Sequence, residues 1–219
     1  NCYKMFSWLT NLKTIDLTYL DTSTVSDMSY MFFKTSSIET LDLTSLNTSN
    51  VTNMKAMFSG CMQLKNVDVS NFNTLKVTSM IDMFCNCQAI KTLDLSSFVT
   101  SNVTSMSGMF YQNYNLIDLD ISNFNTINVT DMQQLFNGCK SLTNMVIPNS
   151  VTSIEDLAFS ECTSLMTIFI PNSVKSLGNS VFYNCDNLTI NCEASVKPNE
   201  WKELWNYSNC KVVWGYKKN

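Results

Sequence analysis

The sequence predicts an α/β repeat solenoid, in which a right-handed coil carries a parallel β-sheet on one face and short helices or turns on the other. Three observations predict this fold class. A Met-Phe landmark recurs at a fixed spacing, an apolar strand pattern stands inside each repeat, and a second apolar pattern with helical spacing follows it. One such unit cannot bury its own apolar stripe, so we expect the units to stack on one another.

The landmark dipeptide defines the length of each repeat. It keeps one phase at an interval of 26 residues, at Met5-Phe6, Met31-Phe32, Met57-Phe58, Met83-Phe84, Met109-Phe110 and Leu135-Phe136. Ala158-Phe159 and Val181-Phe182 follow at intervals of 23 residues. The chain therefore divides into 26-residue repeats over 5–134 and 23-residue repeats over 135–180.

The first half of each repeat predicts a strand. Apolar residues follow an L-x-x-L-x-L spacing, as in Ile38, Leu41 and Leu43. The final pair alternates with polar residues, which is typical of a half-buried strand. This spacing at a period of about 20–29 residues is the leucine-rich-repeat pattern. We therefore expect a parallel sheet with a rise of about 4.8 Å per coil.

The second half of each long repeat predicts a short helix. Val51, Met54 and Met57 are spaced as one helical face. Thr52 stands where an N-cap belongs. The equivalent N-cap candidates in the other long repeats are Ser26, Thr78, Thr104 and Thr130. Each long repeat is therefore expected to contain a strand, a turn and a helix.

Residues 1–185 are expected to form the solenoid and residues 186–219 a C-terminal cap. The closing segment breaks the repeat pattern and holds Trp201, Trp205 and Trp214, and terminal repeats must cover the exposed end of the core. A tryptophan-lined binding pocket is the alternative interpretation. The N-terminal end opens inside a repeat, so we expect a fragment or processed product whose first coil has an open edge.

The composition argues against most enzyme classes. The 219 residues include no His, all 14 basic residues are Lys, and 5 residues are Gly. Histidine-dependent nucleophilic catalysis and arginine clamps are therefore excluded, and no glycine-rich phosphate-binding motif occurs. We expect no enzymatic activity and no cofactor. The net charge of −4 argues against a nucleic-acid partner, and the lack of an 18-residue apolar run argues against direct membrane insertion.

The unit MFSGCMQLKNVDVSNFNTLKVTSMID resembles the 26-residue repeat of BspA-like leucine-rich-repeat surface proteins. The unit AFSECTSLMTIFIPNSVKSLGNS is similar to the shorter repeat of the same superfamily, and the ending WNYSNCKVVWGYKKN is similar to its closing segments. The resemblance implies a leucine-rich-repeat solenoid in a cell-surface or secreted protein of mucosal bacteria or protists. It also implies adhesion to host matrix proteins or to other cells, and it brings no catalytic motif.

Between the two inward residues of each predicted strand, one side chain points outward. In the long repeats this residue is an aspartate with polar neighbours on both sides. The predicted partner-binding residues are these outward triplets: Thr14, Asp16, Thr18; Thr40, Asp42, Thr44; Asn66, Asp68, Ser70; Thr92, Asp94, Ser96; and Asp118, Asp120, Ser122. In the short repeats the Asp position becomes Val146 and Phe169, so the acidic column is expected to end there.

Carboxylates stacked at about 4.8 Å repel one another, so another interaction must offset the repulsion. Three explanations stay open at the level of sequence: solvent with hydrogen bonds from neighbouring Thr and Ser hydroxyls, a cationic protein partner, or calcium. Calcium takes about six to eight oxygen ligands. Asp94, Asp118 and Asp120 are the best candidate cluster for it.

Two further columns predict internal roles. One repeat position is shared by Cys61, Cys87, Cys139, Cys162 and Cys185, which are expected to be small buried fillers. A bridge between Cys192 and Cys210 in the closing segment is an open alternative. Another position is shared by Thr22, Thr48, Thr74, Thr100 and Thr126, whose hydroxyls are expected to satisfy the backbone of turns.

The leading functional hypothesis is a non-enzymatic protein-binding or adhesion module, extracellular or on the cell surface, whose outward sheet face holds a protein or cell-surface ligand. Repeats build a long preorganised surface, which limits the ordering cost of association. The alternative is a structural spacer or an assembly component that packs end to end through its solenoid edges. We expect a monomer whose open N-terminal edge is able to contact another domain.

Overall fold

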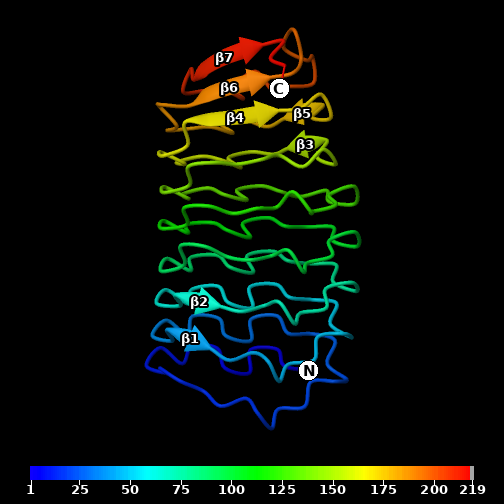
Figure 1. Ribbon diagram of the computed structural model, residues 1–219, viewed down its shortest axis with the longest axis vertical. Helices are drawn as coiled ribbons and strands as arrows, with labels where there is room; N and C mark the ends of the chain where they lie inside the picture. Colours follow the sequence, from blue (N-terminus) through cyan, green and yellow to red (C-terminus); the bar gives the residue numbers. More distant parts are fainter. Residues whose placement is uncertain (218–219) are drawn as a thin grey trace.

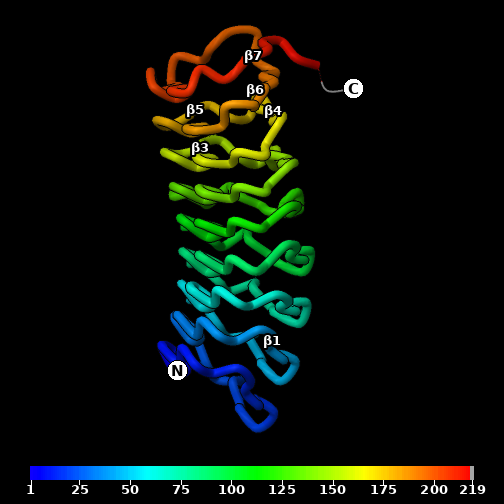
Figure 2. Tube along the Cα trace, turned by 90° about the vertical axis from the view of Figure 1, so that its left-hand side faces the viewer, coloured from blue at the N-terminus to red at the C-terminus, as the bar shows by residue number. Residues whose placement is uncertain are grey.

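The computed structural model describes residues 1–217 and shows a tall stack of coils with the two termini at opposite ends (Figure 1, Figure 2). The predicted parallel-sheet solenoid is confirmed. Its strands are short: β1 (Thr40–Leu41), β2 (Asn66–Val67), β3 (Ser153–Ile154), β4 (Thr167–Ile170), β5 (Ser176–Leu177), β6 (Thr189–Cys192) and β7 (Lys211–Trp214). Within residues 1–217 no helix is formed, so none could cross a membrane.

Two rows of parallel pairing run along the stack. The first row contains the strands of the L-x-x-L-x-L pattern, with β1 paired to β2 and β4, β6 and β7 paired in that order. Isolated bridges from Thr92 to Asp118 and from Val146 to Phe169 lie in the same row. The second row joins coils through Asn53, Ser79 and Ser105, and β3 pairs with β5 on that side. Both rows place equivalent residues of successive coils side by side.

The predicted short helices are wrong. Two residues of each coil, such as Tyr30 (φ 59°) and Lys34 (φ 56°), have left-handed backbone conformations, which an α-helix does not admit. Alternate amides between them point along the solenoid axis: the Phe32 N–H donates to the Met57 carbonyl at 2.8 Å, while the Phe33 N–H donates to the Tyr30 carbonyl at 3.0 Å. Bonds to the next coil therefore replace the bonds of a helix.

The predicted N-caps are wrong for the same reason. The Thr52 amide and hydroxyl both donate to the Ser26 carbonyl of the preceding coil, at 2.8 and 3.2 Å. Thr78, Thr104 and Thr130 repeat this arrangement, each towards the residue one coil earlier. These side chains therefore join coils instead of beginning helices.

The landmark phenylalanines form a continuous aromatic column in the core. Successive rings from Phe6 to Phe182 lie 5.2–6.1 Å apart with nearly parallel planes. Trp205 meets the last ring edge-on at 6.3 Å and packs against Trp201 at 4.9 Å. Trp201 and Trp205 are both buried. The tryptophans thus cover the C-terminal end of the column, while a domain boundary at residue 185 stays a prediction.

The threonine column has the predicted role in turns. The Thr74 hydroxyl donates to the Val99 carbonyl at 3.0 Å and accepts from the Val99 amide at 2.8 Å, and its side chain is buried. Thr22, Thr48 and Thr100 make the same pair of bonds to the coil that follows them. One hydroxyl in each of these coils therefore satisfies a donor and an acceptor that the turn leaves unpaired.

The cysteine column also has its predicted filler role. The Cys61 thiol is buried and points at the Phe32 carbonyl of the preceding coil, with an S···O distance of 3.2 Å. Burial raises the pKa of Cys61 to about 12, so the thiol stays protonated. All nine cysteines of the chain are free thiols. The alternative bridge between Cys192 and Cys210 is therefore not formed.

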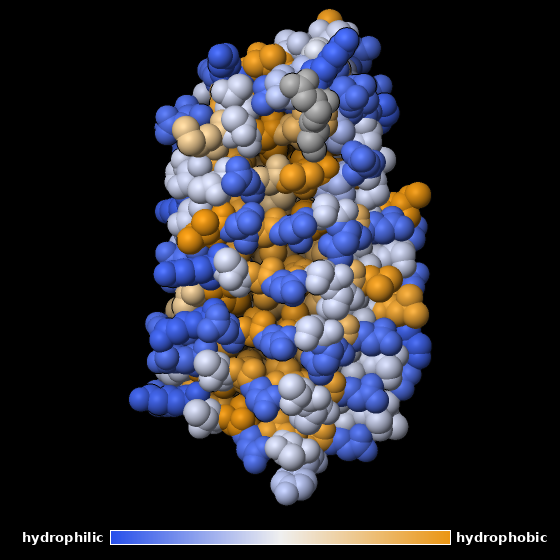
Figure 3. All heavy atoms as spheres, viewed as in Figure 1, coloured by the Kyte–Doolittle hydropathy of each residue, from blue (hydrophilic) through white to orange (hydrophobic). Residues whose placement is uncertain are grey.

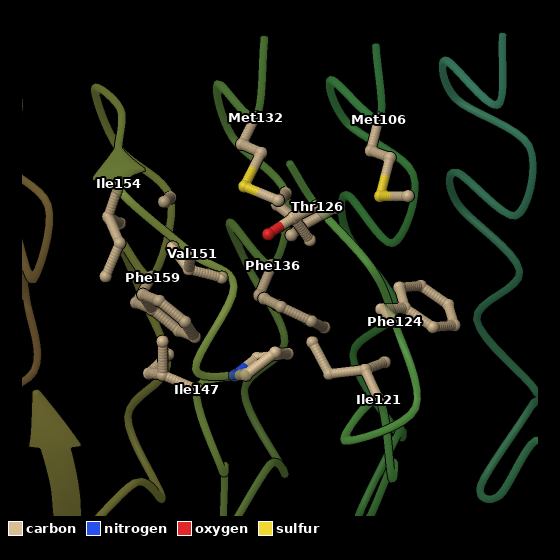
Figure 4. Close-up of a pocket in the computed structure, with 13 residues that line it drawn as sticks. Met106, Ile121, Phe124, Thr126, Met132, Phe136, Ile147, Val151, Ile154 and Phe159 are labelled. Atoms are coloured by element: carbon tan, nitrogen blue, oxygen red, sulfur yellow. The ribbon is translucent and has the colours of Figure 1, made fainter. Parts of the chain in front are cut away.

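A small cavity marks the change from long to short repeats. It holds about 20 Å³ and is lined by apolar side chains of adjacent coils and by Thr126, with Met106, Met132, Phe136 and Phe159 pointing toward it (Figure 4). Ala158 also lines it and stands at the landmark position that Met occupies in the long repeats. The shorter side chain leaves the space unfilled.

We predict that Thr74→Val destabilises the fold by roughly 1–3 kcal/mol, because the nearly isosteric change removes the partner of the Val99 amide and carbonyl in a partly buried turn. Chemical denaturation measures the change. Thr74→Ser keeps the hydroxyl and should cost less, and Thr78→Val, on the exposed threonine column, should change stability by less than about 0.5 kcal/mol. Equal losses for Thr74→Val and Thr78→Val would contradict this assignment.

We predict that Ala158→Val stabilises the fold by about 0.5–1.5 kcal/mol, since two added methyl groups fill the cavity. The next coil already carries valine at this position, Val181, which is fully buried. Thermal unfolding checks the sign, and Val181→Ala is the matched control that should destabilise. A lower melting temperature for Ala158→Val would show that the space is too small for valine.

Candidate binding surface

The outward triplets lie on the sheet face as the alternation of the strands predicts. All fifteen side chains, from Thr14 to Ser122, are exposed, while the flanking residues Leu41 and Leu43 of the second coil are buried. Hydrophilic residues form a column along the middle of this face in its N-terminal part (Figure 3). The register of β1 with β2, which pairs Leu41 with Val67, continues into Asp42 and Asp68 and aligns their carboxylates.

Each carboxylate of this acidic column is oriented by its own strand end. The Asp42 Oδ1 atom accepts hydrogen bonds from the Thr44 hydroxyl at 2.6 Å and from the Thr44 amide at 3.0 Å. The same bond from the amide two residues later reaches Asp16, Asp68, Asp94 and Asp120, at 2.8–2.9 Å. These Asx-turns hold one oxygen in place and leave the second oxygen exposed to solvent.

Hydrogen bonding offsets the repulsion within the column. The hydroxyl and amide of Thr44 lower the pKa of Asp42, and the neighbouring Asp16 charge opposes them more weakly. The Ser96 amide and hydroxyl likewise lower the pKa of Asp94 against the charge of Asp68. The first of the three explanations left open by the sequence therefore operates here, and the column is negatively charged at neutral pH.

Shallow depressions lie along the face, and two carboxylates line each of them. Asp16 and Asp42 line one of about 370 Å³. Asp68 and Asp94 line another of about 420 Å³. A third, of about 310 Å³, contains Asp118 and Asp120. The acidic column is therefore a row of open hollows in which a partner's side chains have room to approach two carboxylates at once.

The calcium candidate is not assembled. Across residues 1–217 no group of three or more Asp, Glu or Cys side chains has the geometry to hold a metal ion, so Asp94, Asp118 and Asp120 do not form such a group. Calcium takes about six to eight oxygen ligands at one point, and the two coils do not bring these three carboxylates together in that way.

The character of the face changes at the short repeats, as the sequence predicts. Val146 is 51% exposed at the position that aspartate occupies in the long repeats, and Phe169 pairs with it in the next coil. The sequence did not indicate Tyr216. The chain turns at Gly215 (φ 67°), and the Tyr216 ring then lies 6.1 Å from the Phe169 ring. A glycine directly after the last strand is the one signal that this chain segment folds back.

The stacked coils, the parallel row of L-x-x-L-x-L strands and the exposed polar sheet face define a leucine-rich-repeat protein, a class that generally serves as a protein-interaction module. The family model described as "BspA type Leucine rich repeat region (6 copies)" matches residues 81–189 and 132–213. The model described as "Mycoplasma protein of unknown function, DUF285" matches residues 1–115. The chain belongs to the BspA-type leucine-rich-repeat family. No curated protein matches it.

One solved structure shares the fold, and a second is similar at a lower TM-score. A leucine-rich repeat protein from Bacteroides ovatus is similar over 97% of this chain, with 23% identity and a TM-score of 0.59. The T. pallidum leucine-rich repeat protein is similar over 91% of this chain and 84% of its own, with 18% identity and a TM-score of 0.45. The chain spans 58% of the length of the Bacteroides ovatus protein.

We predict that the fold loses stability on acidification below about pH 4. The pKa values of the column aspartates are lowered in the folded state, so their contribution is present above the unfolded pKa and lost as the pH falls through the folded pKa. The triple variant Asp42→Asn, Asp68→Asn, Asp94→Asn keeps the acceptor oxygens and removes the titration. Its melting temperature should therefore fall less between pH 5 and pH 2.

The matched control is Asp186→Asn, Glu200→Gln, Glu203→Gln, which removes the same charge from exposed residues that accept no hydrogen bond within the described structure. It should follow the wild-type pH profile. Burial raises the pKa of Asp82 and Glu155, and because both residues are present in every variant, their opposite effect cancels in the comparison. Identical profiles for the two triple variants would contradict the assignment.

Proposed function

We propose that this chain is an extracellular or cell-surface binding module whose acidic sheet face holds a cationic protein partner. The observation that carries the proposal is the aligned column of exposed carboxylates, each oriented by an Asx-turn. Complementary charge on a partner would replace solvent at these oxygens and supply both specificity and fast association. The resemblance to BspA-like surface proteins supports the location and favours host matrix or cell-surface proteins as partners.

The rigidity of the face supports binding. Parallel pairing joins the second outward triplet to the third and the fourth to the fifth, and the Asx-turns orient the aspartates before any partner arrives. Little side-chain freedom is then lost on association, which lowers one of the costs of forming an interface. The hollows of about 310–420 Å³ along the column give lysine or arginine side chains direct access to it.

We predict that the triple variant Asp42→Asn, Asp68→Asn, Asp94→Asn binds cationic partners about tenfold or more weakly at low salt, with a flatter salt dependence. The probes are immobilised extracellular matrix proteins and poly-lysine, measured by surface plasmon resonance at two salt concentrations with and without calcium. The control triple variant at Asp186, Glu200 and Glu203 should keep wild-type binding.

Unchanged affinity and salt dependence in the column variant would overturn the proposal. Binding that requires calcium would instead support the metal-bridged alternative. The same samples are examined by analytical ultracentrifugation, because the first coil exposes Tyr3, Met5 and Trp8. Concentration-dependent filaments without capture of any probe would support the alternative role as an assembly component that packs end to end.

A further inference from the structure

The acidic column ends at an apolar hollow on the same face. This anchor pocket is lined by Val146, Phe169 and Tyr216, together with the polar residues Asn144, Thr167 and Asn191, and holds about 230 Å³. Figure 3 shows hydrophobic residues on the line of the column toward the C-terminal end of the face. Val146 is 51% and Tyr216 39% exposed, so the apolar lining is open to a partner.

The walls of the anchor pocket are held by the fold. Val146 and Phe169 are paired across adjacent coils, and Phe169 is paired with Asn191 in β6. The Tyr216 amide donates to the Cys192 carbonyl at 2.9 Å, which fixes the tyrosine beyond the sheet edge with its ring tilted by 59° against Phe169. The pocket is therefore preformed and closed on its C-terminal side by an aromatic ring.

The size of the anchor pocket selects the kind of occupant. Sites for small-molecule ligands and cofactors usually measure about 300–1,000 Å³, whereas this pocket is smaller and opens onto a long face. Interfaces between proteins commonly place one bulky apolar side chain in such a hollow, surrounded by polar contacts. The dimensions therefore suit a single aromatic or large aliphatic side chain of a partner.

The negative charge of the neighbouring hollow determines which kind of partner residue would lie next to the anchored side chain. The neighbouring hollow contains Asp118 and Asp120 and shares Asn144, Met145 and Val146 with the anchor pocket. Among residues 1–217 no lysine lies within ion-pair distance of either carboxylate. A basic side chain one coil away from the anchored side chain would therefore meet two carboxylates.

We propose that the anchor pocket takes a bulky apolar side chain of a peptide segment in which lysine or arginine residues flank that side chain. This inference rests on the proposed function, because the anchor pocket lies at the C-terminal end of the same acidic face. The apolar side chain enters between Val146 and Tyr216, and the flanking cation lies against Asp118 and Asp120.

The test uses three capped peptides with the cores Lys-Phe-Lys, Lys-Ala-Lys and Glu-Phe-Glu, whose binding to the full chain is measured by fluorescence anisotropy. We expect Lys-Phe-Lys to bind about tenfold more tightly than Lys-Ala-Lys, as partial burial of one aromatic side chain provides. Glu-Phe-Glu should not bind. Val146→Asn and Tyr216→Ala should each abolish the preference for Phe while leaving the binding of Lys-Ala-Lys unchanged.

Ile127→Asn is the matched control, because Ile127 is 74% exposed and lies outside both the column and the pocket; it should keep the full preference. Equal binding of Lys-Phe-Lys and Lys-Ala-Lys to the wild type would overturn the proposal for the anchor pocket but not the proposed role of the acidic face. Loss of binding of Lys-Phe-Lys and Lys-Ala-Lys to an Asp118→Asn, Asp120→Asn variant, with the preference for Phe intact in the wild type, would support both. Wild-type chain that captures matrix proteins but binds none of the peptides would overturn the anchor pocket alone.

Discussion

Hydrogen bonding from coil to coil is the constraint on which the rest of this structure depends. Around each landmark, alternate amides donate along the axis, as Phe58 does to the Met83 carbonyl at 2.9 Å and Phe84 to the Met109 carbonyl at 3.0 Å. A buried amide left without its partner would be costly, so every coil must lie in register with the next. The register in turn places like side chains over one another, which produces the aromatic, hydroxyl and thiol columns of the interior.

The same register builds the candidate binding face. An aspartate at one repeat position becomes a row of carboxylates only because the coils cannot slip against each other. Its Asx-turn is satisfied within its own coil, so the row does not depend on the identity of its neighbours. This independence explains how the row can end abruptly, with Val146 replacing aspartate in one coil and an apolar hollow following, while parallel pairing resumes between Val146 and Phe169.

The repeat period was sufficient to predict the coil, the parallel sheet and the outward triplets, because a fixed interval leaves one way to align equivalent residues. It was not sufficient for the landmark segment. There the apolar spacing fits both a helix and a pair of left-handed turns, and residues such as Tyr30, Lys34 and Leu157 adopt positive φ without being glycine. Tyr216 escaped prediction because a contact made by a chain segment folding back has no periodic signal.

The hydrogen bonding from coil to coil also determines how the molecule responds to force. The termini lie at opposite ends of the stack (Figure 2), and the amide bonds run along the line that joins them. Tension applied through the ends would load the few bonds of an outermost coil before those of the coils behind it. A solenoid pulled through its ends would therefore unfold one coil at a time from an end. Each step would lengthen the chain and dissipate mechanical work while the remaining coils stay folded.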